Sequence, residues 1–174
     1  MRLALVLGTA LLLTGATLTA AADDCPVAPP GEPQRTYRNS RFGYTFVYPP
    51  IFTLDPDSVP ALGDGARFWT SDRRATVVVN AAPANQAQTL RDLLAEAEGD
   101  VLHNSQGEIT YRRIRDNWFV ISGYMMGRIF YRRTLLTGTG VVATLWMEFP
   151  REMRACLDGA VTTMSLSFRP LGLR

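Results

Sequence analysis

The sequence predicts an α+β fold in which an antiparallel β-sheet of about six to seven strands is flanked by helices. Successive strand-like runs follow one another between Gly107 and Phe149, and short turns suited to antiparallel hairpins divide them. Two other stretches, one on each side of this meander, carry apolar residues at helical spacing. The chain has 174 residues, and the part after its first 22 has the length of one ordinary domain.

Residues 1–22 are typical of a secretory signal peptide. The chain starts with Met1 and Arg2, continues with the apolar stretch from Leu3 to Leu13, and reaches three alanines just before Asp23. Signal peptidase recognises this pattern, whereas a membrane-spanning helix needs about 20 apolar residues. We therefore expect cleavage before Asp23, a periplasmic or secreted protein, and no transmembrane segment in the mature chain.

A proline-rich tail, residues 23–36, is expected to precede a single domain that spans residues 37–170. Four prolines and a glycine stand between Pro26 and Gln34, and proline lacks the backbone N–H group that strands and helices use. After the tail, alternate aromatic side chains predict the first strand, which ends at Pro49. These aromatic residues are Phe42, Tyr44, Phe46 and Tyr48.

A loop and a hairpin are predicted next. Asp55 to Gly65 is rich in aspartate, proline and glycine, which favour turns. Residues 66–70 and 75–80 are short β-rich runs, and the charged residues between them predict a hairpin tip.

One helix is expected before the meander in the sequence and one after it. The meander itself should form the centre of the sheet. Asn85 and Gln88 have the spacing of a capping box, so the first helix is predicted to begin there and to end at Gly99. The second is predicted after Pro150. The apolar faces consist of Leu90, Leu93, Leu94 and Ala97 in the first helix and Met153, Leu157, Ala160, Val161 and Met164 in the second.

The chain has two cysteines, Cys25 and Cys156, and we expect them to form a disulfide. An exported protein meets an oxidising compartment, which favours such pairing. Cys156 falls at the border of the apolar face of the second helix, where a tail that crosses the helix could reach its sulfur. Lipidation of Cys25 is the alternative, but a lipoprotein cysteine follows a small residue, and Asp24 stands there.

Composition excludes several function classes. The sequence contains no lysine, so it can build neither a lysine Schiff base nor a phosphate-binding loop that ends in Gly-Lys-Ser/Thr. Loss of Arg2 with the leader leaves 17 basic residues against 16 acidic ones. This balance argues against general nucleic-acid binding, and we expect no cofactor.

No catalytic set or metal site is predicted. The single histidine, His103, is expected in a polar loop, and with both cysteines oxidised no thiol remains as a nucleophile. The spacing of Asp55, Asp57 and Asp64 suggests calcium, but the other positions that an EF-hand loop requires are not filled. No histidine and cysteine cluster has zinc spacing.

Six arginines fall on two strands of the meander. Arginine binds carboxylates and phosphates through two parallel hydrogen bonds, so Arg113, Arg115 and Arg133 could form one patch for an anionic partner. The alternative is a solvated sheet face whose arginines pair with Glu108, Asp116 and Glu148. The alternative is favoured, because neighbouring strand residues alternate faces and the six cannot all point together. The set is Arg112, Arg113, Arg115, Arg128, Arg132 and Arg133.

Most aromatic residues of the meander are expected in the core. Trp69, beside the glycine-rich loop, is the aromatic side chain that could lie at a binding edge, although burial is the commoner fate of tryptophan.

The run from Tyr37 to Pro50 resembles the opening of the PsbP/Mog1/DcrB-like superfamily, where an aromatic–glycine–aromatic strand leads into Tyr-Pro. The predicted order of elements agrees with that family between about Tyr37 and Phe168. The resemblance implies an α/β/α sandwich. It also implies a protein-binding role, since the superfamily includes photosystem II accessory proteins and a regulator that binds a small GTPase.

These observations favour an exported, non-enzymatic binding or accessory module that takes part in protein–protein interaction in the bacterial envelope. Its partner would be an envelope protein or an anionic ligand. The alternative is an envelope hydrolase whose pair of carboxylates cannot be recognised from sequence spacing.

Overall fold

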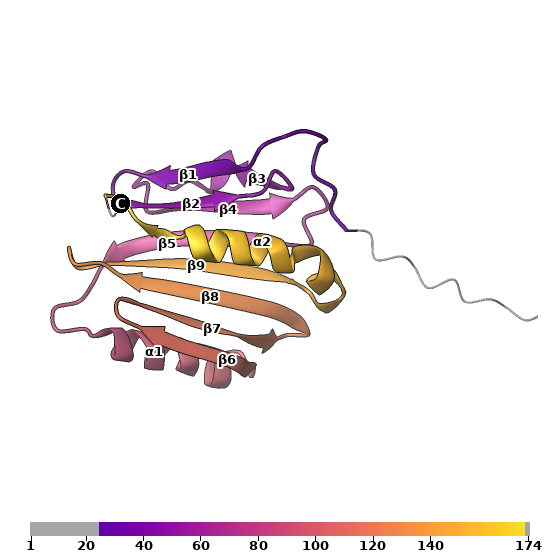
Figure 1. Cartoon of the computed structure of the whole chain (residues 1–174). Helices are drawn as coiled ribbons and strands as arrows, with labels where there is room; N and C mark the ends of the chain where they lie inside the picture. Colours follow the sequence, from indigo (N-terminus) through magenta and orange to yellow (C-terminus); the bar gives the residue numbers. More distant parts are fainter. Residues whose placement is uncertain (1–24, 173–174) are drawn as a thin grey trace, which may run out of the picture.

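The computed structural model describes residues 25–172. The predicted leader, residues 1–22, and its cleavage site before Asp23 lie outside the described residues. Within residues 25–172 no helix has the length and apolar character needed to cross a membrane. The described chain contains a larger and a smaller β-sheet and two α-helices (Figure 1), which confirms the predicted α+β class.

The larger sheet is antiparallel, with strand order β3-β4-β5-β9-β8-β7-β6. Both the predicted hairpin and the predicted meander exist. The meander is not the centre of the sheet, however, because only its last strand, β9, pairs with β5, and β6 is left as an edge. The strands are β3 (Phe52–Asp55), β4 (Gly65–Thr70), β5 (Thr76–Pro83), β6 (Glu108–Arg115), β7 (Trp118–Met125), β8 (Arg128–Leu136) and β9 (Val141–Pro150).

The smaller sheet consists of β1 (Arg35–Asn39), β2 (Tyr44–Tyr48) and β10 (Arg169–Pro170), with β2 in the middle. The predicted aromatic strand is β2, and β1 begins inside the stretch expected to be a tail. Alternate residues of β2 point into the core, where the Phe46 ring lies edge-on to Phe68 of β4 with centroids 5.5 Å apart. The smaller sheet therefore packs on the larger one through aromatic rings.

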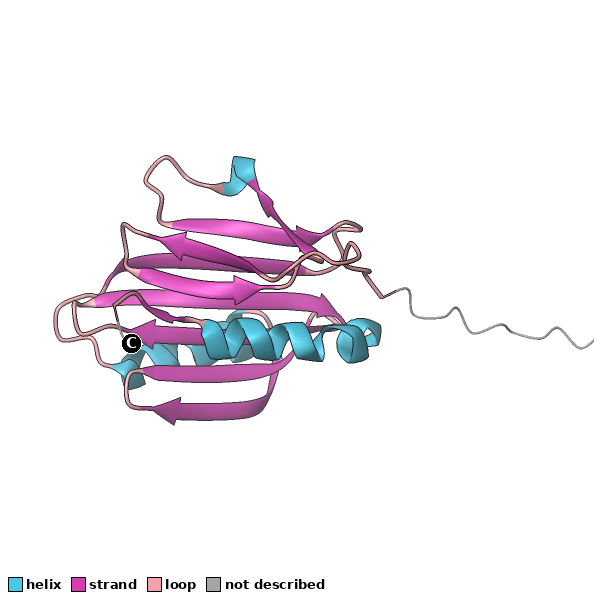
Figure 2. Ribbon diagram, turned by 45° about the horizontal axis from the view of Figure 1, so that its top comes forward, coloured by secondary structure: helices cyan, strands magenta, loops and turns pink. Residues whose placement is uncertain are grey.

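The two α-helices lie on opposite faces of the larger sheet (Figures 1 and 2). Helix α2 (Arg154–Ser167) and the smaller sheet share one face, which we call the α2 face, and the Ser167 hydroxyl accepts a hydrogen bond from the Val47 amide at 2.8 Å. Helix α1 (Leu90–Gly99) covers β7 on the other face, the α1 face. A short helical turn follows α1, η2 (Asp100–Asn104), and another precedes α2, η3 (Arg151–Met153). A third, η1 (Pro56–Ser58), lies between β3 and β4.

Helix α1 begins four residues later than the sequence predicted. Its N-cap is Thr89, whose hydroxyl accepts from the Asp92 amide while the Asp92 carboxylate accepts from the Thr89 amide at 2.8 Å. Asn85 and Gln88 form a turn before the helix. The α-helix ends at Gly99 as predicted, and η2 follows it directly as a π-helical turn. His103 therefore lies exposed on this turn and not in a loop.

Two tight turns set the register of the meander. Met126 and Gly127 both have positive φ angles, 49° and 77°, as two-residue hairpin turns with right-handed strand twist require. This turn pairs Val120 with Arg133, and the turn between β6 and β7 pairs Val120 with Arg113. Arg113, Val120 and Arg133 consequently form one row across three strands.

The predicted disulfide between Cys25 and Cys156 is present, with the two Cα atoms 5.5 Å apart. It joins the start of the described chain to α2. The loop it closes spans a sequence separation of 131 residues. On the chain-entropy model, closing such a loop stabilises the fold by about 5 kcal/mol. The bond anchors a proline-rich tail that makes few other contacts.

A candidate anion-binding surface

The six arginines of β6 and β8 divide equally between the two faces of the sheet. Strand alternation places three of them on each side, as the registers with buried neighbours show. The α1 face carries Arg112, Arg128 and Arg132, and the α2 face carries Arg113, Arg115 and Arg133.

Each arginine of the α1 face has a carboxylate partner. Arg112 Nε lies 2.7 Å from Glu98 Oε1, and Arg132 Nη1 lies 3.7 Å from Asp100 Oδ2. Arg128 Nε lies 2.5 Å from Glu148 Oε1, which confirms Glu148 as a partner.

Glu108 and Asp116, the other two predicted partners, form no ion pair with arginine in residues 25–172. That expectation is wrong because α1 and η2 supply the acidic residues instead. Helix packing brings Glu98 and Asp100 to the sheet, and spacing along the meander could not reveal this.

The arginines of the α2 face have no carboxylate within ion-pair distance among the described residues. Arg133 and Arg113 lie beside the same indole: their guanidinium carbons are 4.2 Å and 5.7 Å from the ring centroid of Trp118. Arg115 pairs with Trp118 across the hairpin, but the described chain gives its side chain no hydrogen bond, ion pair or ring contact. The structure thus brings Arg113 and Arg133 together at Trp118 and leaves Arg115 at the margin.

Arg133 is half-buried and incompletely satisfied. Its Nε is buried and has no hydrogen-bond partner in the described chain, and its Nη1 donates to Ser165 Oγ at 3.4 Å. Burial lowers the pKa of the Arg133 guanidinium, and the Tyr131 hydroxyl group provides the opposing effect. A desolvated cation without a counter-ion is costly, so the site is electrostatically prepared for an anion.

Two hydroxyl groups lie beside Arg133. Tyr131 Oη and Ser165 Oγ are 2.7 Å apart, which links β8 to α2. Burial raises the pKa of the Tyr131 hydroxyl, although its hydrogen bond with Ser165 and the charge of Arg133 oppose the shift. The Tyr131 hydroxyl therefore keeps its proton near pH 7 and can donate a hydrogen bond to an anion.

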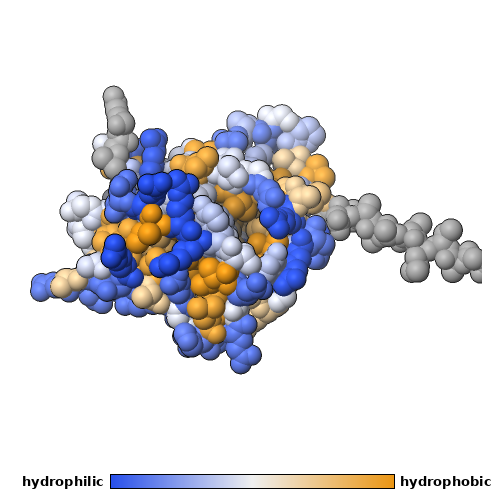
Figure 3. All heavy atoms as spheres, turned by 60° about the horizontal axis from the view of Figure 1, so that its bottom comes forward, coloured by the Kyte–Doolittle hydropathy of each residue, from blue (hydrophilic) through white to orange (hydrophobic). Residues whose placement is uncertain are grey.

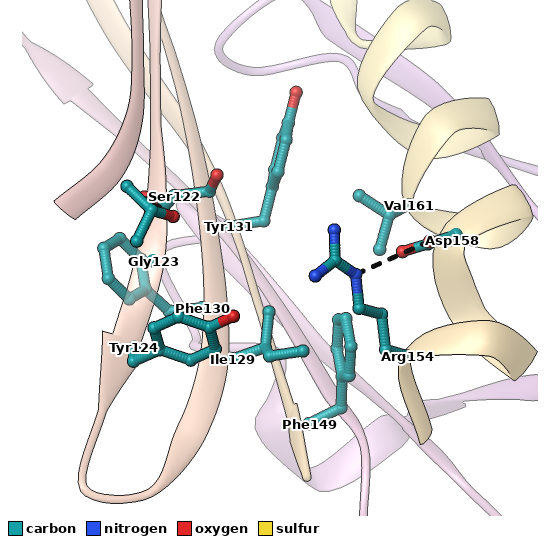
Figure 4. A pocket seen from close by; sticks show the side chains of 11 residues that line it. Ser122, Gly123, Tyr124, Ile129, Phe130, Tyr131, Phe149, Arg154, Asp158 and Val161 are labelled. Atoms are coloured by element: carbon teal, nitrogen blue, oxygen red, sulfur yellow. Dashed lines mark hydrogen bonds and ion pairs between the residues drawn. The ribbon is translucent and has the colours of Figure 1, made fainter. Parts of the chain in front are cut away.

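A hollow of about 110 Å³ opens next to this cluster, between β7, β8 and α2 (Figure 4). Apolar side chains of Ile129, Phe149 and Val161 line it, together with Tyr131. Arg154 lies at the hollow and faces Asp158 one helical turn away, with Nε and Oδ2 3.8 Å apart. Pockets that hold cofactors or drug-sized molecules measure about 300–1,000 Å³, so this hollow suits a single side chain.

The neighbouring edge of the sheet is mixed in character. Figure 3, with the β6 end of the molecule brought forward, shows hydrophobic patches separated by strongly hydrophilic ones. Tyr111 and Ile114 of β6 are 47% and 38% exposed, although they are large apolar side chains. The edge strand therefore offers both aromatic surface and charge.

Trp69 is remote from this cluster. It lies on β4, half-buried on the α1 face, and the guanidinium carbon of Arg73 is 4.2 Å from its ring centroid. Its neighbour Phe68 points into the α2-face core. The idea that Trp69 forms a second binding edge stays a prediction.

The aspartates of the glycine-rich loop share one hollow. Asp55, Asp57 and Asp64 line it together, and Asp64 Oδ1 is buried without a hydrogen-bond partner in the described chain. Residues 25–172 nevertheless contain no group of three or more acidic, histidine or cysteine side chains arranged to hold a metal ion.

Among residues 25–172, two aspartates have clearly displaced pKa values, and both values are lowered. Burial alone would raise the pKa of Asp72, but hydrogen bonds from Thr70 and Arg74 lower it to about 2. Hydrogen bonds with Thr89 lower the pKa of Asp92. A general acid at neutral pH needs a raised pKa, so these residues give the hydrolase alternative no support.

Comparison with known proteins finds similarity in structure alone. No family model matches the sequence, and no curated protein matches it. Cyanobacterial PsbP (CyanoP) from Synechocystis sp. PCC 6803 superposes with a TM-score of 0.62 at 15% identity, covering 90% of this chain and 98% of that one. The chain has a PsbP/Mog1-like fold. The Saccharomyces cerevisiae Ran-binding protein Mog1p also superposes, with a TM-score of 0.61 at 10% identity over 80% of this chain and 96% of that one.

The sequence resemblance at Tyr37 to Pro50 is thus confirmed at the level of the fold. The residues of the candidate site that sequence reasoning missed are Trp118, Tyr131 and Ser165. A signal for Trp118 was present, since the two hairpin turns alone place Arg113 and Arg133 in the row next to it. No signal could have found Ser165, which reaches Arg133 through helix packing.

Proposed function

We propose that this protein is an exported, non-enzymatic module that binds another protein of the bacterial envelope through the α2 face of strands β6 to β8. The observation that carries the proposal is the cluster of Arg113 and Arg133 around Trp118, without a carboxylate partner in the described chain. Tryptophan and arginine are the residue types that dominate binding energy at protein interfaces.

Two further observations support export and a protein partner. The disulfide between Cys25 and Cys156 suits an oxidising compartment, and residues 1–22 have the pattern of a leader. A structural neighbour, Mog1p, is a Ran-binding protein, so the fold can serve as a protein-binding scaffold. The fold alone identifies neither partner nor surface, and for this chain the arginine cluster suggests the surface.

Site-specific photo-crosslinking tests the proposal. A photoreactive phenylalanine analogue replaces Tyr111, which lies on β6 two residues from Arg113, and in a second variant it replaces Leu102 on η2. Both side chains are 47% exposed, so the two probes sample solvent equally. The proposal predicts one discrete protein adduct from position 111 in the envelope fraction and none of that mass from position 102.

Charge reversal shows whether the adduct depends on the arginines. Arg113→Glu combined with Arg133→Glu is expected to abolish it, whereas Arg38→Glu combined with Arg91→Glu changes net charge equally and should keep it. Arg133 is half-buried, so its replacement by glutamate could destabilise the fold. Arg113 is exposed, so the single variant Arg113→Glu repeats the test without that effect. An adduct that persists in both variants of the cluster would disprove this surface.

A further inference from the structure

We propose that the α2 face recognises an extended acidic segment of the partner protein: Arg133 and Arg113 receive a carboxylate of that segment, and the hollow beside Tyr131 receives an apolar side chain. This inference rests on the proposed function and specifies the chemistry of the partner. It is carried by the charge of the arginine cluster, the donors around it, the size of the hollow and the distance between the two.

The charge of Arg133 has no carboxylate counter-ion in the described chain. Its neighbour Arg132 is also desolvated, but Asp100 and Glu96 compensate the charge there. Asp100 comes from the chain itself, and nothing equivalent approaches Arg133 in the described residues. A carboxylate that reaches the solvent-accessible part of the Arg133 guanidinium would supply the counter-charge that the described chain lacks.

The groups around the site are hydrogen-bond donors. Arg113 and Arg133 offer guanidinium N–H groups from two sides of Val120, and the hydroxyls of Tyr131 and Ser165 lie beside Arg133. An ionised carboxylate accepts hydrogen bonds at both oxygens and donates none. The donor set therefore suits a ligand that only accepts hydrogen bonds, such as a carboxylate.

The hollow lies at a distance that an extended chain can span. Ile129, in its floor, and Arg133 are four residues apart on β8, or about 13 Å, and Tyr131 lies between them. An extended segment that runs along β8 covers this distance in two to four residues once side-chain reach is included. An apolar residue and an acidic residue at that separation would occupy both positions.

The charges at the two positions differ. At the hollow, Arg154 Nε lies 3.8 Å from Asp158 Oδ2, so these two charges offset each other. Arg133 has no carboxylate within ion-pair distance among the described residues. The acidic residue of the partner is therefore assigned to Arg133 and its apolar residue to the hollow.

A protein segment fits this surface better than a small free anion. Pockets for small molecules bury about 70–90% of the ligand, whereas here the receptor is an open sheet face with a hollow for one side chain. Most of the binding surface must then come from the backbone and flanking residues of a longer chain.

A peptide titration tests the inference. The probe is a fluorescent nine-residue peptide with one leucine and, two to four positions after it, three glutamates, all other residues being serine or glycine. The inference predicts saturable binding that weakens at least about tenfold when glutamine replaces the glutamates, and that also weakens when alanine replaces the leucine. Fluorescence anisotropy with the purified, oxidised protein measures both.

Protein variants test whether the arginines bind the glutamates of the peptide. Arg133→Gln and Arg113→Gln should each weaken the glutamate peptide and leave the residual binding of the glutamine peptide unchanged. Arg112→Gln is the matched control, since it removes the same charge from the neighbouring position on the other face. The melting temperature of Arg133→Gln confirms folding, and the exposed Arg113 provides an independent result if that variant is unstable.

Other outcomes contradict the inference. Equal binding of the glutamate and glutamine peptides, or binding that neither cluster variant reduces, would overturn it. Arg133-dependent binding of phosphatidylglycerol vesicles or inorganic phosphate, with no binding of the peptide, would assign the site to phosphate in place of a protein carboxylate. If the peptide fails but the crosslink from position 111 persists and requires Arg113, the proposed function stands and only the acidic-segment inference falls.

Discussion

Arg132 and Arg133 are consecutive residues of β8, yet only Arg132 has a carboxylate partner in the described chain, Asp100 at 3.7 Å. Alternation along the strand directs Arg132 to the α1 face and Arg133 to the α2 face, where its guanidinium lies 4.2 Å from the Trp118 ring centroid. Burial lowers the pKa of both guanidinium groups. The fold thus pairs one half-buried arginine with a carboxylate and leaves its neighbour without one in the described chain.

The first prediction compares how replacement of Arg132 and of Arg133 changes the free energy of unfolding. Arg132→Met should lower the unfolding free energy by about 1 kcal/mol, because it removes the ion pair with Asp100. Arg133→Met should leave it unchanged or raise it by about 1 kcal/mol, since a desolvated charge disappears and apolar volume is kept. Urea unfolding at pH 7 measures both. Equal losses in the two variants would show that Arg133 serves the fold and not a ligand.

The second prediction concerns Asp72 at the hairpin tip. Its pKa of about 2 in the folded protein lies below the ordinary 3.8, so the stabilisation it provides is present above about pH 4 and is lost as the pH falls through 2. Asp72→Asn should lower the unfolding free energy at pH 7 by less than about 1 kcal/mol, because solvent screens the exposed group. Urea unfolding across this pH range should show the difference vanish near pH 2. A difference that stays constant with pH would contradict an electrostatic origin, and Asp158→Asn is the exposed control.

The third prediction concerns the disulfide. Replacement of Cys25 and Cys156 by serine should lower the unfolding free energy by up to about 5 kcal/mol, because the unfolded chain regains the entropy of an open loop. Urea unfolding of the wild-type chain with and without reductant should show the same loss. The double-serine variant should not respond to reductant, and a wild-type curve equally insensitive to it would contradict the prediction.

The fourth prediction tests export. When the full chain is produced in a bacterial host with its own leader, mass spectrometry of the periplasmic fraction should find a protein that begins at Asp23. Both sulfurs should resist alkylation before reduction. Recovery of the uncleaved chain from the cytosol, with both thiols free, would be incompatible with the proposed location.

Local sequence signals predicted most of the elements. Alternating aromatic residues located β2, and the turns at Asp116 and Met126 located the hairpins whose register aligns Arg113 with Arg133. The start of α1 was misplaced because Asn85 and Gln88 imitate a capping box, while the real box uses Thr89 and Asp92. Two overlapping capping signals cannot be ranked without the packing of the helix.

Long-range packing accounts for the rest. In the folded sheet β9 pairs with β5, which leaves β6 at an edge. Local sequence signals do not determine which distant strands pair. The partners of the arginines also depend on long-range packing, because Glu98 and Asp100 reach the sheet only through α1 and η2. The sequence therefore favoured a solvated arginine face paired with carboxylates, and in the described chain such pairs are present on the α1 face alone.

The NMR signal of the Arg133 Nε–Hε group tests the central claim most directly, because it responds to an anion that binds this guanidinium, which has no carboxylate partner in the described chain. Titration of isotope-labelled protein with the glutamate peptide should shift this signal downfield and slow its exchange with water, in a saturable manner. The corresponding signal of Arg132 should not move. No shift at Arg133, or equal shifts at both arginines, would contradict the account.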